Sequence, residues 1–155
     1  DRRLRRVLPP PPGLHRPAHG DGVSGEASTP PPDCVFCSRL EGDALLAANE
    51  LAVGFLAGFP VNPGHVLIVP RRHEADFFSL SAPEQAAMVA LVEPIRRHLD
   101  DEFKPDAYNL GANIGTAAGQ TIRHAHLHVI PRYAGDVEEP RGGVRWVLPQ
   151  TARYW

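Results

Sequence analysis

The sequence predicts one α+β domain, in which a sheet of short strands carries a single main helix. The 155 residues fit one ordinary domain and leave little room for a second. Short apolar runs with β-branched residues, bounded by turn residues, occur on both sides of one segment with helical periodicity. The resulting order of strand, strand, helix, strand, strand is typical of an α+β sheet.

The first two strands are expected before the helix. Two apolar runs, 51–57 and 65–69, are separated by Asn62, Pro63 and Gly64, which is strong turn chemistry. We therefore expect the two runs to be neighbouring strands of a hairpin or meander.

The helix is expected over residues 82–102. Ser81 and Glu84 have the spacing of a capping box, which marks a helix N-terminus. Large apolar residues then recur at helical spacing. They are Met88, Leu91, Val92, Ile95 and Leu99. Pro94 lies inside this segment, and it should kink the helix or mark its solvent face.

Two more strands are expected after the helix, over residues 107–113 and 122–130. Between them, residues 115–120 have the composition of a tight glycine-bearing loop. Pro131 should end the last strand, because proline cannot donate a hydrogen bond to a strand ladder.

Composition and charge exclude several classes of protein. No stretch approaches the roughly 20 uncharged apolar residues that a membrane helix needs, so we expect no membrane-spanning segment. The 16 basic and 18 acidic side chains give a net charge of -2, which provides no positive field for nucleic acid. Cys34 and Cys37 are too close in sequence for a disulfide that staples a fold, and this favours a reducing, cytoplasmic setting.

Residues 1–33 differ in composition from the rest of the chain. Eight of the 17 prolines lie in this segment, together with four glycines and few large apolar residues. Such a segment cannot bury enough apolar surface to offset the entropy lost on ordering. We expect a disordered, partly polyproline N-terminal tail, followed by a folded part that begins at Cys34.

Three histidines alternate with apolar residues in the last predicted strand. Because successive side chains of a strand alternate faces, His124, His126 and His128 should project from one face at intervals of about 6.6 Å. The opposite face would be apolar and buried. It consists of Ala125, Leu127 and Val129.

Two chemistries fit this row of imidazoles. Histidine is a common ligand of transition metals, so the row could bind a metal ion. Alternatively, one neutral imidazole could attack a phosphate while its neighbours donate hydrogen bonds to the phosphoryl oxygens. The loop from Gly115 to Gly119 would let backbone N–H groups approach an anion, and Gln120 and Asn113 offer uncharged donors. Phosphate binding therefore accounts for more of the neighbourhood than metal binding does.

At these residues the chain resembles the histidine triad (HIT) family. The segment GQTIRHAHLHVIPRYAGD, residues 119–136, is similar to the fragile-histidine-triad branch, and NPGHVLIVP, residues 62–70, resembles the first block of the family. The likeness covers about residues 34–136, which we interpret as a HIT domain followed by a C-terminal extension, 137–155. It implies an antiparallel sheet of about five strands, nucleotide chemistry at an α-phosphate, and a homodimer whose sheets join.

The resemblance also implies roles for single residues. His126 matches the nucleophile that forms a nucleotidyl-histidine intermediate, with His128 and His65 as phosphate-binding and orienting partners. Gln120 matches the polar residue near the bridging or leaving oxygen. Asn113 matches a phosphate contact.

One position departs from the family pattern. Ala57 lies eight residues before His65, where the family usually has Asp or Asn to hold the ribose hydroxyls. A methyl group cannot accept those hydrogen bonds, which would forfeit roughly 1 to 3 kcal/mol if the hydroxyls stayed buried. The preferred nucleoside therefore cannot be inferred from this position.

The Cys34-x-x-Cys37 pair has three interpretations from its residues alone: a redox pair, half of a zinc site, or two small apolar residues. A redox motif is expected in a βαβ unit, which this sequence does not predict. In bacterial histidine triad proteins that resemble this chain, a structural zinc joins such a pair to two histidines. Those positions are His73 and His124 here.

The resemblance favours cleavage at the α-phosphate of a dinucleoside polyphosphate, because 119–121 and 131–136 match that branch. The alternatives are a nucleoside phosphoramidase, a nucleotidyltransferase and a nucleotide-binding module without catalysis. Aromatic and basic residues of the extension 137–155 could cover a nucleobase or the site of the neighbouring subunit.

Overall fold

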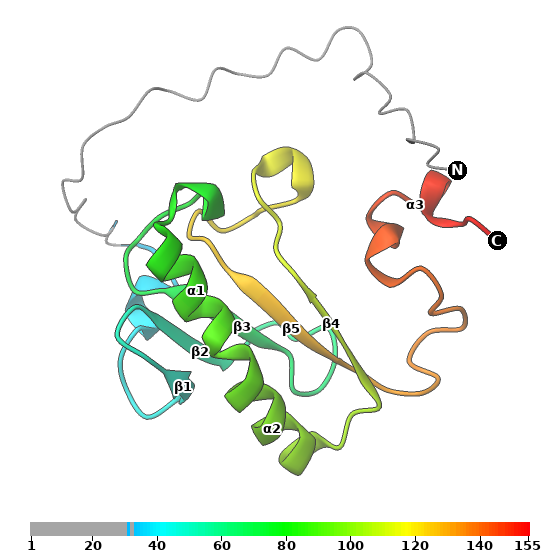
Figure 1. Ribbon diagram of the computed structural model, residues 1–155, viewed down its shortest axis with the longest axis horizontal. Helices are drawn as coiled ribbons and strands as arrows, with labels where there is room; N and C mark the ends of the chain where they lie inside the picture. Colours follow the sequence, from blue (N-terminus) through cyan, green and yellow to red (C-terminus); the bar gives the residue numbers. More distant parts are fainter. Residues whose placement is uncertain (1–30, 32) are drawn as a thin grey trace, which may run out of the picture.

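The structure, a computed structural model, describes residue 31 and residues 33–155. Apart from Pro31 and Asp33, the predicted N-terminal tail lies outside the described residues. The domain is an antiparallel five-stranded sheet in the order β1-β2-β3-β5-β4, with its main helix across one face (Figure 1). The strands are β1 (Leu45–Ala48), β2 (Ala52–Leu56), β3 (Val66–Pro70), β4 (Ala107–Gly111) and β5 (Leu127–Arg132). The α+β class and the antiparallel sheet of five strands are thus confirmed.

The two faces of the sheet bury different sets of side chains. Val66 and Ile68 of β3 pack in the core beneath the helix, with Met88 and Ile95. Leu67 and Val69 point the other way and pack around Phe36, which precedes a 3-10 helix at Cys37–Arg39. Leu67 is paired with His128 of β5, so His128 belongs to this second face, as does His65 at the start of β3. We call it the histidine face.

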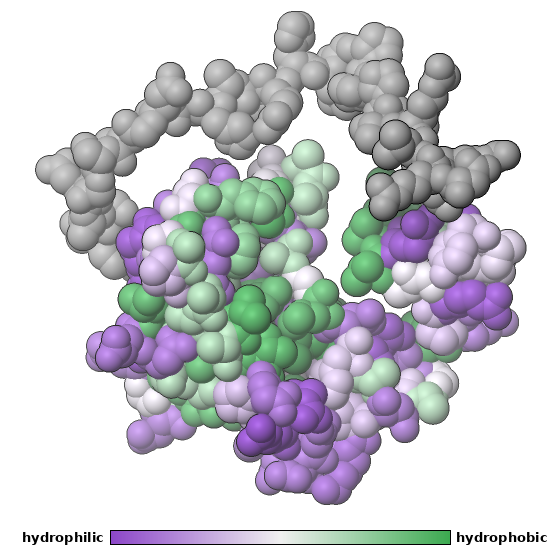
Figure 2. Space-filling model, viewed as in Figure 1, coloured by the Kyte–Doolittle hydropathy of each residue, from purple (hydrophilic) through white to green (hydrophobic). Residues whose placement is uncertain are grey.

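The predicted helix forms as two consecutive segments, α1 (Ala82–Ala90) and α2 (Val92–Phe103). The capping box is present: the Ser81 hydroxyl accepts from the Glu84 N–H, and the Glu84 carboxylate accepts from the Ser81 N–H at 2.7 Å. The helix is interrupted at Leu91 because Pro94 has no N–H to donate to the carbonyl of Ala90, four residues earlier. Pro94 is exposed in the first turn of α2. Figure 2 shows the solvent side of α2 as a hydrophilic patch low in the view.

The last strand forms, but it begins later than the predicted residue 122 and ends beyond the predicted residue 130. β5 begins at Leu127, so His124 and His126 lie in the irregular segment before it. The N–H of Ala125 donates to the carbonyl of Glu74, which draws this segment away from the β3 ladder. Pro131 lies inside β5 rather than ending it. It is tolerated because β3 pairs with β5 only as far as Val129.

Strand β1 was missed, because its sequence LLAA has no β-branched or aromatic residue, which are the residues enriched in strands. After β5, the extension forms a 3-10 helix at Gly143–Val147 and a short α3 (Pro149–Ala152). Within residues 33–155, no helix is long and apolar enough to cross a membrane.

The contact between β2 and α2 gives a test of this packing. A Cβ atom added at Gly54 would lie 2.5 Å from Cδ1 of Ile95, whereas one added at Gly111 of β4 would meet nothing within 4 Å. Gly54→Ala should therefore lower the free energy of unfolding by about 1 to 3 kcal/mol. Gly111→Ala, measured in the same urea titration, should change it by no more than about 0.5 kcal/mol. Equal effects would contradict this packing.

Candidate functional site

Three histidine side chains meet on the histidine face. The rings of His65 and His128 are stacked with centroids 5.2 Å apart, and the ring of His126 meets that of His128 edge-on at 4.9 Å. His65 and His126 are buried, with 4% and 6% of their surface exposed. The structure thus brings together three of the residues that the sequence singled out.

A main-chain hydrogen bond assigns the proton of His126. Its Nδ1 lies 2.8 Å from the backbone oxygen of His124. A carbonyl oxygen can only accept, so Nδ1 carries the hydrogen. In the neutral ring Nε2 then keeps its lone pair, which makes it the nucleophilic nitrogen.

A second chain of hydrogen bonds assigns the protons of His65 and His128. The N–H of Val61 donates to Nδ1 of His65 at 3.3 Å, so neutral His65 carries its proton on Nε2. That Nε2 lies 3.0 Å from Nδ1 of His128 and donates to it. The proton of His128 is therefore on Nε2. This atom is buried and has no hydrogen-bond partner among residues 31 and 33–155, so its N–H can donate to a ligand.

Burial keeps His65 and His128 neutral. It lowers the pKa of His128 to about 4, helped by the repulsion that protonated His126 and His65 would exert on a protonated His128. Burial also lowers the pKa of His65, with a smaller contribution from His126. At neutral pH both rings are therefore uncharged. Val61 then donates to His65 and His65 donates to His128, which leaves the proton of His128 on Nε2.

Asn113 and Gln120 lie in different surroundings. Asn113 lines a cavity of about 340 Å³ together with His65 and His128. Gln120 instead ties its own loop together: its oxygen accepts from the Gly115 N–H at 2.8 Å, and its amide donates to the carbonyls of Ala75 and Ile122. The positive φ of Gly115, 83°, lets the loop make this turn.

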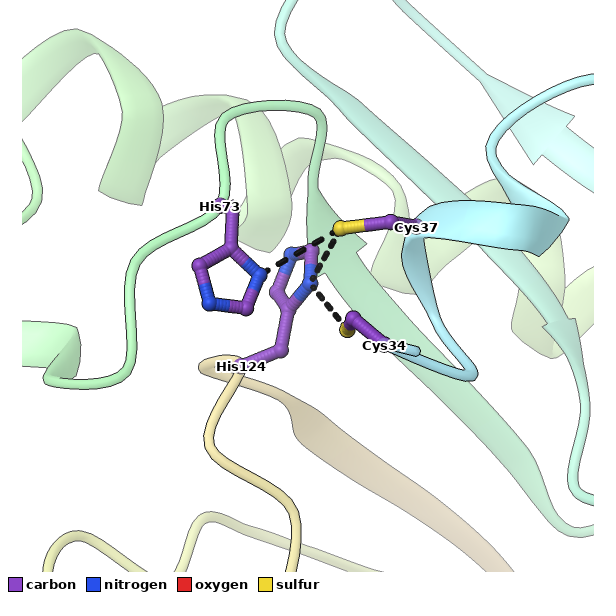
Figure 3. A group of neighbouring side chains, drawn as sticks. All are labelled: Cys34, Cys37, His73 and His124. Carbon is purple, nitrogen blue, oxygen red and sulfur yellow. Dashed lines mark hydrogen bonds between the residues drawn. The ribbon is translucent and has the colours of Figure 1, made fainter. Parts of the chain in front are cut away.

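A second cluster lies beside the first. The ligand atoms of Cys34, Cys37, His73 and His124 all lie within 4.8 Å of one another, and Figure 3 shows them converging from three segments of the chain. The two sulfurs are 3.6 Å from Nδ1 of His124, and the sulfur of Cys37 is 3.3 Å from Nδ1 of His73. Tetrahedral zinc places neighbouring sulfur and nitrogen ligands about 3.5 Å apart, so the four residues fit a metal ion.

The tautomer of His124 also suits a metal. Its Nε2 lies 2.9 Å from the carbonyl oxygen of Pro70 and donates to it, which leaves the lone pair of Nδ1 facing the sulfurs. Burial, with a contribution from Cys34, raises the pKa of the Cys37 thiol to about 11. A cation that binds here must therefore displace the thiol proton.

Sequence reasoning missed two contacts of the site. Phe36, between the two cysteines, packs edge-on against His126 with ring centroids 5.2 Å apart. Val61 supplies its N–H to His65. An apolar residue inside a Cys-x-x-Cys pair was the available signal for Phe36, whereas nothing in the sequence pointed to a backbone group.

Comparison with known proteins gives the family. The HIT domain family model matches residues 41–135, so this chain belongs to the HIT family. An uncharacterized HIT-like protein of Mycoplasma genitalium is 38% identical over 103 residues, 64% of this chain and 73% of that protein. The AP-4-A phosphorylase of Mycobacterium tuberculosis is 34% identical over 116 residues, 73% of this chain and 59% of that enzyme.

A solved structure is similar as well. The zinc-bound histidine triad family protein from Mycobacterium smegmatis is 32% identical, with a TM-score of 0.62 over 69% of this chain and 80% of that one.

The low pKa of His128 predicts a pH dependence of stability. Folding lowers the pKa from its ordinary value of about 6.5 to about 4, so the unfolded chain binds more protons between these values. The resulting stabilisation is complete above about pH 6.5 and is lost as the pH falls toward 4. The substitution His128→Asn should therefore reduce the decrease in the free energy of unfolding between pH 6.5 and pH 4.5, as measured by urea titration. An unchanged slope would contradict a buried neutral His128.

Proposed function

We propose that this chain is a nucleotide hydrolase that cleaves at the α-phosphate through a nucleotidyl-His126 intermediate. The observation that carries the proposal is the protonation of two neighbouring rings on the histidine face, His126 and His128. The hydrogen bond to His124 leaves a lone pair on Nε2 of His126, and the relay through His65 leaves an unpartnered N–H on Nε2 of His128. A nucleophile beside a donor suits displacement at a phosphate.

In the first step, the lone pair of His126 Nε2 forms a bond to the α-phosphorus, and the bond to the leaving group breaks with its electron pair. The ring becomes cationic, and its Nδ1–H stays bonded to the carbonyl of His124, which stabilises that charge. Nε2–H of His128 and the amide of Asn113, on the same cavity, would meet the phosphoryl oxygens.

In the second step, water attacks the phosphorus and the bond to His126 breaks. The nucleoside monophosphate leaves, a proton of the water is released, and His126 returns to its neutral form. Gln120 keeps its predicted role near the leaving oxygen as part of this proposal; its three hydrogen bonds hold the loop from which it would act.

A second candidate differs only in the acceptor. The relative named AP-4-A phosphorylase favours transfer of the nucleotidyl group to phosphate in place of water. Product analysis in the presence of phosphate separates the two, because phosphorolysis would yield a nucleoside diphosphate.

We also propose that the Cys34, Cys37, His73 and His124 cluster binds a structural zinc ion. The donor distances and the zinc-bound relative from Mycobacterium smegmatis support this. Four protein ligands would leave no open position for substrate, so zinc would fix the position of the segment that carries His126 and take no part in the chemistry.

We also propose that the chain forms the homodimer that the resemblance implies. Among the described strands β4 is paired on one side only and offers an edge for it.

The nucleophile is tested by turnover of diadenosine tetraphosphate and of an adenosine phosphoramidate. His126→Ala should lower kcat for any substrate that the wild type cleaves by about 10⁴-fold or more. His98→Ala, an exposed histidine on α2, is the control and should leave kcat unchanged. A His126→Ala protein that keeps a tenth of the wild-type rate would refute the proposed role.

The metal is tested by elemental analysis. The purified protein should hold one zinc ion per chain, and Cys34→Ser should lose it and melt roughly 10 °C lower, because metal binding contributes to folding free energy. Ser38→Ala, at an exposed hydroxyl next to the cluster, should keep both zinc and melting temperature. Zinc that stays bound in Cys34→Ser but is lost in His126→Ala would place the metal in the other cluster.

A further inference from the structure

The N–H of Val61 is the first donor of the hydrogen bonds that fix the protons of His65 and His128. Val61 lies in the loop between β2 and β3, where its side chain is 67% exposed and that of Phe59 is 97% exposed. Within the part of the chain that the structure describes, no main-chain hydrogen bond joins residues 58–61 to another main-chain group. This segment therefore has little packing or main-chain bonding of its own to place the N–H of Val61.

The side chain of the next residue, Asn62, is held through both hydrogens of its amide. Its Nδ2 lies 3.0 Å from the carbonyl oxygen of Pro131 and 2.8 Å from Oδ2 of Asp136. A carbonyl oxygen and an ionised carboxylate can only accept, so Nδ2 donates to both. The ladder between β3 and β5 ends at Val129, so the carbonyl of Pro131 meets the amide of Asn62 where a β3 residue would otherwise follow.

Asp136 is a fixed, charged acceptor for this amide. Its oxygens accept from Nε and Nη2 of Arg132, each at 2.7 Å, and Oδ2 also accepts from the Tyr133 N–H at 3.0 Å. Only 20% of the Arg132 side chain and 13% of the Asp136 side chain are exposed. The hydrogen bonds from Arg132 hold the pKa of Asp136 well below its usual range, so the carboxylate is ionised at neutral pH. A hydrogen bond to an ionised acceptor is stronger than one between neutral groups, so Asp136 anchors Asn62 to the end of β5.

Asn62 also begins the tight turn that ends at His65. The N–H of His65 donates to the carbonyl of Asn62 at 3.1 Å, and Gly64 adopts the positive φ, 81°, that the turn requires. The anchored residue thus lies between the Val61 donor and the ring that accepts from it. At 3.3 Å the hydrogen bond from Val61 to Nδ1 of His65 is already long, so a small shift of Asn62 would break it.

Loss of the Val61 N–H would free the protons of both rings. Neutral His65 could then carry its hydrogen on Nδ1 and accept at Nε2 from Nδ1 of His128, across the same 3.0 Å contact. In that arrangement Nε2 of His128 has a lone pair in place of its hydrogen. A lone pair there would repel a phosphoryl oxygen, whereas the N–H would bind it.

We propose that Asn62 is a positioning residue of the reaction. Its anchored side chain keeps the N–H of Val61 on His65, and this keeps the hydrogen of His128 on Nε2. The inference rests on the proposed function, in which Nε2–H of His128 meets the phosphate. Asn62 acts only through Val61 and the two rings.

The test compares Asn62→Ala with Asn49→Ala. Asn49 is a matched control, because it is also half-buried and its side chain makes three hydrogen bonds that hold the loop between β1 and β2. The ¹⁵N chemical shifts of the His128 ring, identified by their absence in His128→Asn, distinguish a protonated from an unprotonated nitrogen. At neutral pH, Nε2 should be protonated in the wild type and in Asn49→Ala. In Asn62→Ala its resonance should move toward the unprotonated position.

Turnover should follow the ring protons. Asn62→Ala should lower kcat by about tenfold or more and change KM less, because it removes a donor to the transition state. Asn49→Ala should keep the wild-type kcat. The hydroxyl of Asn62→Ser can replace one of the two hydrogen bonds, so this variant should show smaller changes of the same sign. It serves as the test if Asn62→Ala does not fold.

The failures of the two proposals are distinguishable. Three results refute Asn62 as a positioning residue while the nucleotide hydrolase stands: His128 shifts that do not change in the Asn62 variants, an equal change in Asn49→Ala, or a changed tautomer with the wild-type kcat. If the wild type turns over neither diadenosine tetraphosphate nor an adenosine phosphoramidate, the proposed function fails and the role of Asn62 in the reaction fails with it.

Discussion

The hydrogen bond from Nδ1 of His126 to the backbone oxygen of His124 is the constraint on which the site depends. It selects the nitrogen that can attack, orients the ring, and remains in place to stabilise the ring when it becomes cationic. The acceptor is a main-chain atom, so its position is set by the path of the chain rather than by a rotamer. That path is irregular here because β5 starts only at Leu127. The departure from a regular strand is what turns the carbonyl of His124 toward the ring two residues later.

His124 connects the two clusters. Its side chain faces Cys34 and Cys37 while its backbone oxygen faces His126, so one residue belongs to the candidate metal site and to the candidate active site. Phe36 provides a second connection, because its ring lies against both histidines and its neighbours in sequence carry the thiols. A metal held by this cluster would therefore restrain the nucleophile through covalent and packing contacts, without touching substrate.

The sequence predicted those parts of the molecule that depend on local pattern. β2, β3, β4 and the capping box follow from periodicity and turn residues, and the row of histidines at 124, 126 and 128 follows from spacing. His65 and the joining of the cysteine pair to His73 and His124 came from the resemblance to the HIT family. The prediction failed where contacts between residues distant in sequence determine the structure. β1 forms only because β2 pairs with it, and β5 starts late because Ala125 bonds to Glu74. Likewise, the protonation of His128 depends on an N–H from Val61. No sequence pattern encodes these contacts.

Among the ring nitrogens of His65, His126 and His128, only Nε2 of His126 is assigned a lone pair that no hydrogen bond uses. Rapid acid-free quenching during turnover of an α-³²P-labelled adenylyl substrate, followed by peptide mass spectrometry and ¹⁵N–³¹P NMR of the trapped protein, examines this atom directly. We expect one adenylyl group per chain, bonded through Nε2 of His126. Label on Nδ1, on another histidine, or turnover with no label on the protein at any time would contradict it.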